Sequence, residues 1–252
     1  MKRIRLRIAY DGTNYCGWQR QDNAVTVEEK LQEALDGLFY KGIEILGASR
    51  TDSGVHALGN VAVFDVETRI PAEKIAIALN HQLPHDIRIM QSDEVSAKFH
   101  PRYCDSRKTY EYTITHTDTE IPTRSRTSYH VYRPLDLEMM RQCAKYLEGE
   151  HDFSAFCSAG AQVQSKVRRV YSVEIRRNEL PVTGGEEIVI RVQGNGFLYN
   201  MVRIIAGTLI EVGMGRRSIE TVKEAIETGE RSLAGPTAPA KGLTLVRIDY
   251  DE

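Results

Sequence analysis

The strongest constraint on the fold is the alternation of basic and apolar residues near the amino terminus, in the stretch KRIRLRIAY. Ile4, Leu6 and Ile8 alternate there with arginines. Successive side chains of a β-strand point to opposite faces, so a period of two predicts a strand with one apolar and one basic face. The alternation returns in residues 108–115, where Tyr110 and Tyr112 share one face. We therefore expect sheets that bury one face of each strand.

Helices are expected between the strands. Thr26 followed by Glu29 predicts a capping box, and Asp136 is expected to cap a later helix. Further helices are expected over residues 72–83, over residues 197–212 and from Ser218, and further strands over residues 43–48, 61–66, 87–90, 170–176, 188–192 and 243–250. These elements do not follow a strict βαβα rhythm, which favours the α+β class.

We expect an α+β fold in which two RRM- or ferredoxin-like halves share a mostly antiparallel central sheet with flanking helices. The chain of 252 residues is long enough for two domains. The crossover between the halves is expected near residues 95–107. This gives an amino-terminal domain of residues 1–98 and a carboxy-terminal domain of residues 99–252.

The formal net charge of −2 excludes a global basic field, so a polyanionic partner would need a local patch. Residues 1–20 and residues 162–177 each hold five basic residues and one acidic residue. Aromatic residues are interleaved with basic ones in residues 99–112, a mixture that suits base stacking beside phosphate contacts. The alternative is that these runs are solvated faces and that Tyr110 and Tyr112 belong to the core.

Several function classes find no support in the sequence. The four cysteines are scattered without a C-x-x-C motif, which argues against a disulfide framework or a zinc site and favours a reducing cytoplasm. The amino terminus lacks the apolar core of a signal peptide, and no apolar stretch is long enough to span a bilayer. Phosphate-binding loops, H-E-x-x-H and Ser-His-Asp patterns are missing from the sequence.

The stretch GASRTDSGVHAL contains more charged and polar side chains than a turn requires. By spacing alone, Asp52 is best interpreted as a turn residue. Two arginines favour a catalytic role: Arg50 lies two residues away, and Arg203 lies in the otherwise apolar stretch FLYNMVRIIAG, where its burial would need an anionic partner. Asp52 is a candidate for that partner, although the chain has 35 acidic residues. A carboxylate kept ionised in this way suits a nucleophile or a base.

Along nearly its whole length the chain resembles the tRNA pseudouridine synthase A family. The resemblance rests on seven blocks in order: YDGTNYCGWQRQ (10–21), SRTDSGVHA (49–57), FHPRY (99–103), RKTYEY (107–112), HDFSAF (151–156), FLYNMVRIIAG (197–207) and APAKGL (238–243). Ser53 stands where many relatives carry alanine. The resemblance implies an isomerase that detaches uracil from C1′ and rejoins it through C5, at uridines 38, 39 and 40 of the tRNA anticodon stem-loop. It also implies a cytoplasmic homodimer that needs no cofactor or metal.

The resemblance also assigns residues, with the active site in a cleft between the two domains. Asp52 matches the essential aspartate, Arg203 its arginine partner, Arg50 the residue that displaces the target base, and Tyr110 the aromatic that packs on the flipped uracil. Positions that contact tRNA are implied to be Arg102, Tyr103, Gln162, Gln164 and Lys166. Whether the aspartate attacks C1′, adds to C6 or removes a ribose proton stays open. For His56 we expect a structural role.

Two other functions are compatible with parts of the pattern. An RRM-like RNA-binding module without catalytic activity would assign no role to Arg50, Asp52 and Arg203. The chain also has no RNP1-like sequence. A hydrolase or phosphotransferase with Asp52 as nucleophile would need a second carboxylate or a set of metal ligands nearby.

Overall fold

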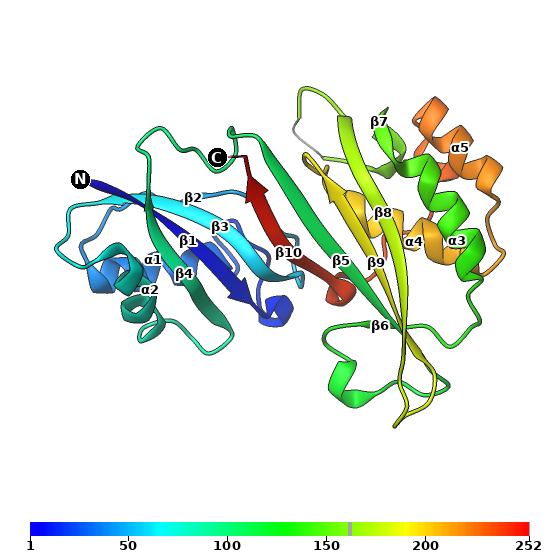
Figure 1. Ribbon diagram of the computed structural model, residues 1–252, viewed down its shortest axis with the longest axis horizontal. Coiled ribbons are helices and arrows are strands. Elements are labelled where there is room, and N and C mark those ends of the chain that lie inside the picture. The colour runs from blue at the N-terminus through cyan, green and yellow to red at the C-terminus, as the bar shows by residue number, and fades with distance from the viewer. Residues whose placement is uncertain (161–162, 252) are drawn as a thin grey trace. The chain divides into compact units, whose positions relative to one another are not determined.

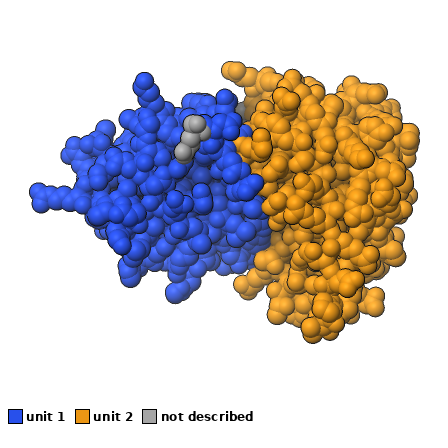
Figure 2. All heavy atoms as spheres, viewed as in Figure 1, with its two compact units in different colours: residues 1–106, 244–252 blue, residues 107–243 orange. Residues whose placement is uncertain are grey.

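The computed structural model describes residues 1–160 and 163–251, which form two compact units (Figures 1 and 2). Unit 1 comprises Met1–Ser106 together with Thr244–Glu252, and unit 2 comprises Arg107–Leu243. The last segment of the chain therefore belongs to the same unit as the first hundred residues.

Unit 1 has the strand order of a ferredoxin-like fold. Its elements are β1 (Lys2–Tyr10), α1 (Val27–Leu38), β2 (Leu46–Gly47), β3 (His56–Val66), α2 (Ala72–Asn80), β4 (Ile87–Val95) and β10 (Leu243–Tyr250). The strands β4, β1, β3 and β2 lie side by side in this order and are antiparallel, whereas β10 pairs with β3 in parallel. In Figure 1, α1 and α2 lie together on one side of these strands.

Strand β1 confirms the predicted alternation. Ile4, Leu6 and Ile8 are fully buried, and their apolar side chains build the core of unit 1. On the opposite face, the pairing register sets Arg3 beside Asp65 and Arg5 beside Asp93, and each arginine forms an ion pair with its neighbour. Part of the predicted basic face is therefore neutralised within the unit.

Helix α1 begins as predicted, because the hydroxyl of Thr26 accepts a hydrogen bond from the N–H of Glu29. Helix α2 ends at Asn80, three residues before its predicted end. The side-chain amide of Asn80 exchanges hydrogen bonds with the backbone of Ile89, which joins the helix end to β4. Strand β4 in turn continues to Val95, five residues beyond the prediction, because it stays paired with β1.

Unit 2 begins with two strands, continues with a helix and three further strands, and ends with two helices. Its elements are β5 (Ser106–His116), β6 (Tyr129–His130), α3 (Leu137–Ala144), β7 (Gly149–Asp152), β8 (Val167–Glu179), β9 (Glu186–Gly194), α4 (Met201–Gly213) and α5 (Ile219–Thr228). Strands β5, β9, β8 and β7 are neighbours in this order and antiparallel, and β6 pairs with β5 in parallel. The three helices gather on one side of the strands (Figure 1). The α+β class with mostly antiparallel strands is thus confirmed.

Helix α4 is the central helix of unit 2, and all but two of its residues are buried. It begins at Met201 rather than at residue 197 as predicted. Asn200 has a left-handed backbone, with φ 61° and ψ 6°, and this conformation cannot belong to a right-handed helix. Asp136 caps α3 as predicted, through hydrogen bonds from the N–H groups of Glu138 and Met139.

Short 3-10 helices complete the connections, at Gly12–Asn14, Pro122–Arg124, Lys145–Leu147, Ser154–Phe156, Arg231–Leu233 and Ala240–Gly242. Across the part of the chain that the structure describes, no helix combines the length and the hydropathy that a membrane crossing requires.

Candidate active site

Asp52 lies in the loop between β2 and β3, with its side chain partly exposed between the buried residues Thr51 and Val55. Its carbonyl accepts a hydrogen bond from the N–H of Val55 at 3.1 Å, and Gly54 takes a φ of 77° to close the turn. Asp52 is therefore part of a turn, and the turn presents its carboxylate at the surface of unit 1.

Buried side chains of β1 and β3 form hydrogen bonds that hold this loop in place. The phenol of Tyr10 hydrogen-bonds the hydroxyl of Thr51 at 2.8 Å. The amide of Asn60 donates to the carbonyl of Ser49 at 3.1 Å and lies 3.3 Å from the same phenol. All four residues are buried. Strands β1 and β3 therefore fix the residues on the amino-terminal side of Asp52.

The segment after β1 supports the loop from another side. The N–H of Trp18 donates to the carbonyl of Thr51 at 3.1 Å, and the N–H of Gly54 donates to the carbonyl of Tyr15 at 3.2 Å. Gly17 has a φ of 85°, and a Cβ at this residue would lie 2.5 Å from the carbonyl oxygen of Thr51. Glycine is required here because the two backbones approach so closely.

His56 is buried behind the loop. Its Nδ1 accepts a hydrogen bond from the N–H of Gly12 at 3.1 Å, so the proton of the neutral ring is on Nε2. Asp11 Oδ1 lies 3.2 Å from the same nitrogen, a contact that becomes an ion pair only when the ring is protonated. These contacts hold the turn after β1, which agrees with the structural role expected for His56.

Three predicted RNA-binding residues lie in unit 1. Arg50 is exposed on the loop itself. Arg102 donates from Nε to the carbonyl of Gly47 at 2.6 Å, so it contacts the start of the loop although it is distant in the sequence. Tyr103 is 85% exposed, and its ring stacks on His100 with 4.1 Å between centroids.

Arg203 lies in the first turn of α4 and is partly buried. Its Nε donates to the carbonyl of Ala238 at 2.8 Å, and its Nη1 donates to Oδ1 of Asn200 at 2.7 Å. The phenol of Tyr112 donates to the carbonyl of Pro239 at 2.9 Å, so Arg203 and Tyr112 bind adjacent carbonyls. Burial raises the pKa of Tyr112, and the phenol stays protonated.

Tyr110 is almost fully buried in β5. Its ring packs edge-to-face on Phe197, with 5.3 Å between centroids. Gln164 and Lys166 are exposed in the segment that leads into β8. Gln162, predicted with them, lies outside the described residues.

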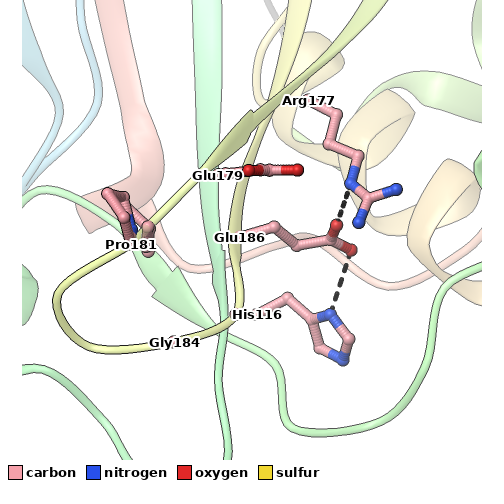
Figure 3. A pocket seen from close by; sticks show the side chains of 8 residues that line it. His116, Arg177, Glu179, Pro181, Gly184 and Glu186 are labelled. Atoms are coloured by element: carbon pink, nitrogen blue, oxygen red, sulfur yellow. Dashed lines mark hydrogen bonds and ion pairs between the residues drawn. The ribbon is translucent and has the colours of Figure 1, made fainter.

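Unit 2 also has hollows at the other end of β5. One of about 430 Å³ is lined by His116, Arg177 and Glu186, with the hairpin between β8 and β9 (Figure 3). His116 is six residues along β5 from Tyr110, roughly 20 Å at the rise of a strand. Glu186 accepts from Nδ1 of His116 at 3.1 Å and pairs with Arg177, so these groups bind one another. We therefore do not assign the active site to this hollow.

Within the described residues there is no group of three or more His, Cys, Asp or Glu side chains placed to hold a metal ion. A family model described as tRNA pseudouridine synthase matches residues 7–104 and 143–251, which include Asp52 and Arg203 but not Tyr110. The chain belongs to the tRNA pseudouridine synthase family. The resemblance predicted from the seven sequence blocks is thereby confirmed.

Relatives in this family match the chain from end to end. The tRNA pseudouridine synthase A of Thermoanaerobacter sp. (strain X514) is 46% identical over 99% of this chain and 100% of its own length. The corresponding enzyme of Ruminiclostridium cellulolyticum is 48% identical with the same coverage. A Clostridium perfringens relative named tRNA pseudouridine synthase A 2 is 44% identical, again with the same coverage.

Two residues beside the site were not predicted as functional from the sequence. Tyr10 is only the first residue of the block YDGTNYCGWQRQ, and Asn200 lies inside the helix expected over residues 197–212. The available signals were local. Tyr10 is the last strand residue before the Asp-Gly turn, and Asn200 is a residue type that favours the left-handed conformation.

Proposed function

We propose that this chain is an isomerase that converts uridines 38, 39 and 40 of the tRNA anticodon stem-loop to pseudouridine. In this reaction the bond from C1′ to N1 of uracil breaks, a bond from C1′ to C5 forms, and the proton on C5 is replaced by one on N1. No electrons are gained or lost. The observation that carries the proposal is the carboxylate of Asp52 on a loop fixed by buried hydrogen bonds, in a chain of this family.

Asp52 is the proposed essential residue, and each role considered for it uses the ionised carboxylate. It would attack C1′ or C6 as a nucleophile, or remove a ribose proton as a base. Arg203 is the proposed second catalytic residue, because a guanidinium favours the ionised form of a carboxylate and stabilises negative charge that develops in a transition state.

The target base must leave the RNA stack before it can react. We propose that Arg50, exposed beside Asp52, takes the place of the base, and that the ring of Tyr110 packs on the extruded uracil. Arg102, Tyr103, Gln162, Gln164 and Lys166 are the proposed contacts to the rest of the tRNA. We also propose that the enzyme is a cytoplasmic homodimer that works without a metal or cofactor.

The deciding experiment maps pseudouridines in an unmodified tRNA transcript treated with wild type or with Asp52→Asn. Asparagine has the size of aspartate but cannot ionise. The matched control is Asp22→Asn, an exposed aspartate in the same unit. We expect pseudouridine at positions 38–40 with wild type and Asp22→Asn and none with Asp52→Asn, while tRNA affinity and melting temperature are unchanged.

Each alternative result contradicts a different part of the proposal. Pseudouridine formed by Asp52→Asn would overturn the role of Asp52. Modification at other positions would overturn the proposed target. Tight tRNA binding by the wild type without any pseudouridine would favour an RNA-binding module, and cleavage or phosphate release by the wild type would favour a hydrolase. Light scattering of the purified protein tests the homodimer, which a monomeric mass would contradict.

A further inference from the structure

Asn200 has an unusual backbone at the start of α4. Among the described residues it is the one non-glycine residue with a positive φ, and glycine is the residue that takes this conformation without strain. The residue before a helix normally has an extended backbone and accepts a hydrogen bond from the first turn. The side chain of Asn200 makes no such capping bond. Capping therefore does not explain its conformation.

The side chain of Asn200 instead links two residues. Its Oδ1 accepts from Nη1 of Arg203 at 2.7 Å, and its Nδ2 donates to Oγ of Ser158 at 2.9 Å. The orientation of the amide follows from chemistry, because a guanidinium can only donate and must face the oxygen. Ser158 is itself held, since its N–H donates to the carbonyl of Tyr199 at 3.1 Å.

These bonds fix the plane of the Arg203 guanidinium. Its Nε is bound to the carbonyl of Ala238 at 2.8 Å and its Nη1 to Asn200, so two separate acceptors define one orientation of the planar group. Loss of Asn200 would remove one of these two acceptors, so the orientation of the guanidinium would be less well defined.

We infer that Asn200 is a positioning residue that orients Arg203 for catalysis and is itself held by Ser158. This inference rests on the proposed catalytic role of Arg203. It explains why the residue is not glycine, which would adopt the backbone but offer Arg203 no side-chain acceptor. The left-handed backbone is the kind of local strain that persists at functional sites.

The primary test is Asn200→Gly, which keeps the left-handed backbone free of strain and removes only the amide. We expect kcat for pseudouridine formation to fall about 10- to 100-fold, a range typical of a lost supporting interaction at an active site, while KM for tRNA stays within twofold and the melting temperature does not fall. Ser158→Ala should lower kcat about two- to fivefold. Asn195→Ala is the control, because its amide bonds the backbone of Arg169 in the same connection, and it should leave kcat unchanged.

A positioning role is distinguished from a merely structural one by whether the effect of Asn200→Gly on kcat depends on Arg203. If Asn200 acts through that residue, Asn200→Gly should change kcat less than twofold in an Arg203→Lys background, because effects of residues in one network are not additive. A wild-type kcat for Asn200→Gly, or an equal fall in both backgrounds, would overturn the inference. Failure of the proposed function is a separate result, since it would appear as the absence of pseudouridine at positions 38–40 after treatment with the wild type.

Discussion

The phenol of Tyr10 and the hydroxyl of Thr51 form a buried hydrogen bond of 2.8 Å that joins the end of β1 to the residue before Asp52. Asn60 on β3 lies 3.3 Å from the same phenol and also bonds the carbonyl of Ser49. The position of the candidate catalytic carboxylate therefore depends on three buried polar side chains.

Tyr10→Phe should weaken both stability and catalysis. The variant loses only the hydroxyl, which removes the Tyr10 partner of Thr51 and leaves Asn60 with its bonds to Ser49 and Val61. We therefore expect the free energy of unfolding, measured in urea, to fall by about 1–2 kcal/mol. The loosened loop should lower kcat about tenfold at saturating tRNA. The control is Tyr15→Phe, which loses a hydroxyl bonded to Asp86 at 2.6 Å but keeps the carbonyl that accepts from Gly54. An equal kcat for the two variants would contradict the prediction.

Gly17→Ala should displace the loop. The added Cβ would lie 2.5 Å from the carbonyl oxygen of Thr51, and alanine disfavours the φ of 85°. We expect a loss of about 2–4 kcal/mol in unfolding free energy and a loss of activity under conditions where the variant is still folded. Gly42→Ala isolates the backbone effect, because Gly42 has a φ of 92° with nothing within 4 Å of its Cβ position. If both variants retain full activity, the close approach is not needed for function.

The proposed role of Tyr110 requires its ring more than its hydroxyl. Tyr110→Phe should keep most of the activity, because packing on uracil and on Phe197 uses the ring faces and edges. Tyr110→Leu should lower kcat strongly. Leucine is chosen rather than alanine because its larger side chain leaves a smaller cavity in the core. Rates of pseudouridine formation at saturating tRNA decide the order. If Tyr110→Phe is the worse variant, the hydroxyl takes part in the reaction.

Lys166 should contribute to tRNA affinity through phosphate contacts. It is exposed at the start of β8, whereas Arg176 further along the strand pairs with Glu174 at 2.6 Å. We expect Lys166→Ala to weaken binding and to reduce the slope of log affinity against log salt concentration by about one. Arg176→Ala should change the slope much less. Equal slopes for wild type and Lys166→Ala, from binding titrations at several salt concentrations, would remove Lys166 from the interface.

The ion pair between Arg3 and Asp65 should make stability depend on pH. Hydrogen bonds from Arg3 lower the pKa of Asp65 in the folded state. The pair therefore stabilises the fold above the ordinary aspartate pKa of about 4, and its contribution is lost as the pH falls through the lowered value. Since both groups are partly exposed, we expect Asp65→Asn to lower the unfolding free energy by about 0.5–1 kcal/mol at pH 7 and by less at pH 3. A difference that stays constant across this range would contradict the prediction.

Much of the fold was predictable because its signals are local. The period of two in β1, the capping box at Thr26 and the cap at Asp136 each depend on residues close in sequence, and all three were confirmed. The start of α4 was mispredicted because the apolar pattern of residues 197–212 does not reveal the left-handed backbone of Asn200. The side chain of Asn200 bonds Ser158, which is distant in sequence, and no local pattern reports such a contact.

The sequence by itself determined the fold class and the family, and it singled out Asp52 for the proposed site, because periodicity, caps and ordered motifs depend only on the order of residues along the chain. Only the tertiary structure decided how that residue is held. The hydrogen bonds of Tyr10 to Thr51 and of Arg102 to Gly47 join residues about 40 and 55 positions apart, which strand pairing and chain crossing bring within hydrogen-bond distance. The tertiary structure also decided which arginines of β1 are neutralised, because the register of β1 with β3 and β4 places an aspartate beside Arg3 and another beside Arg5.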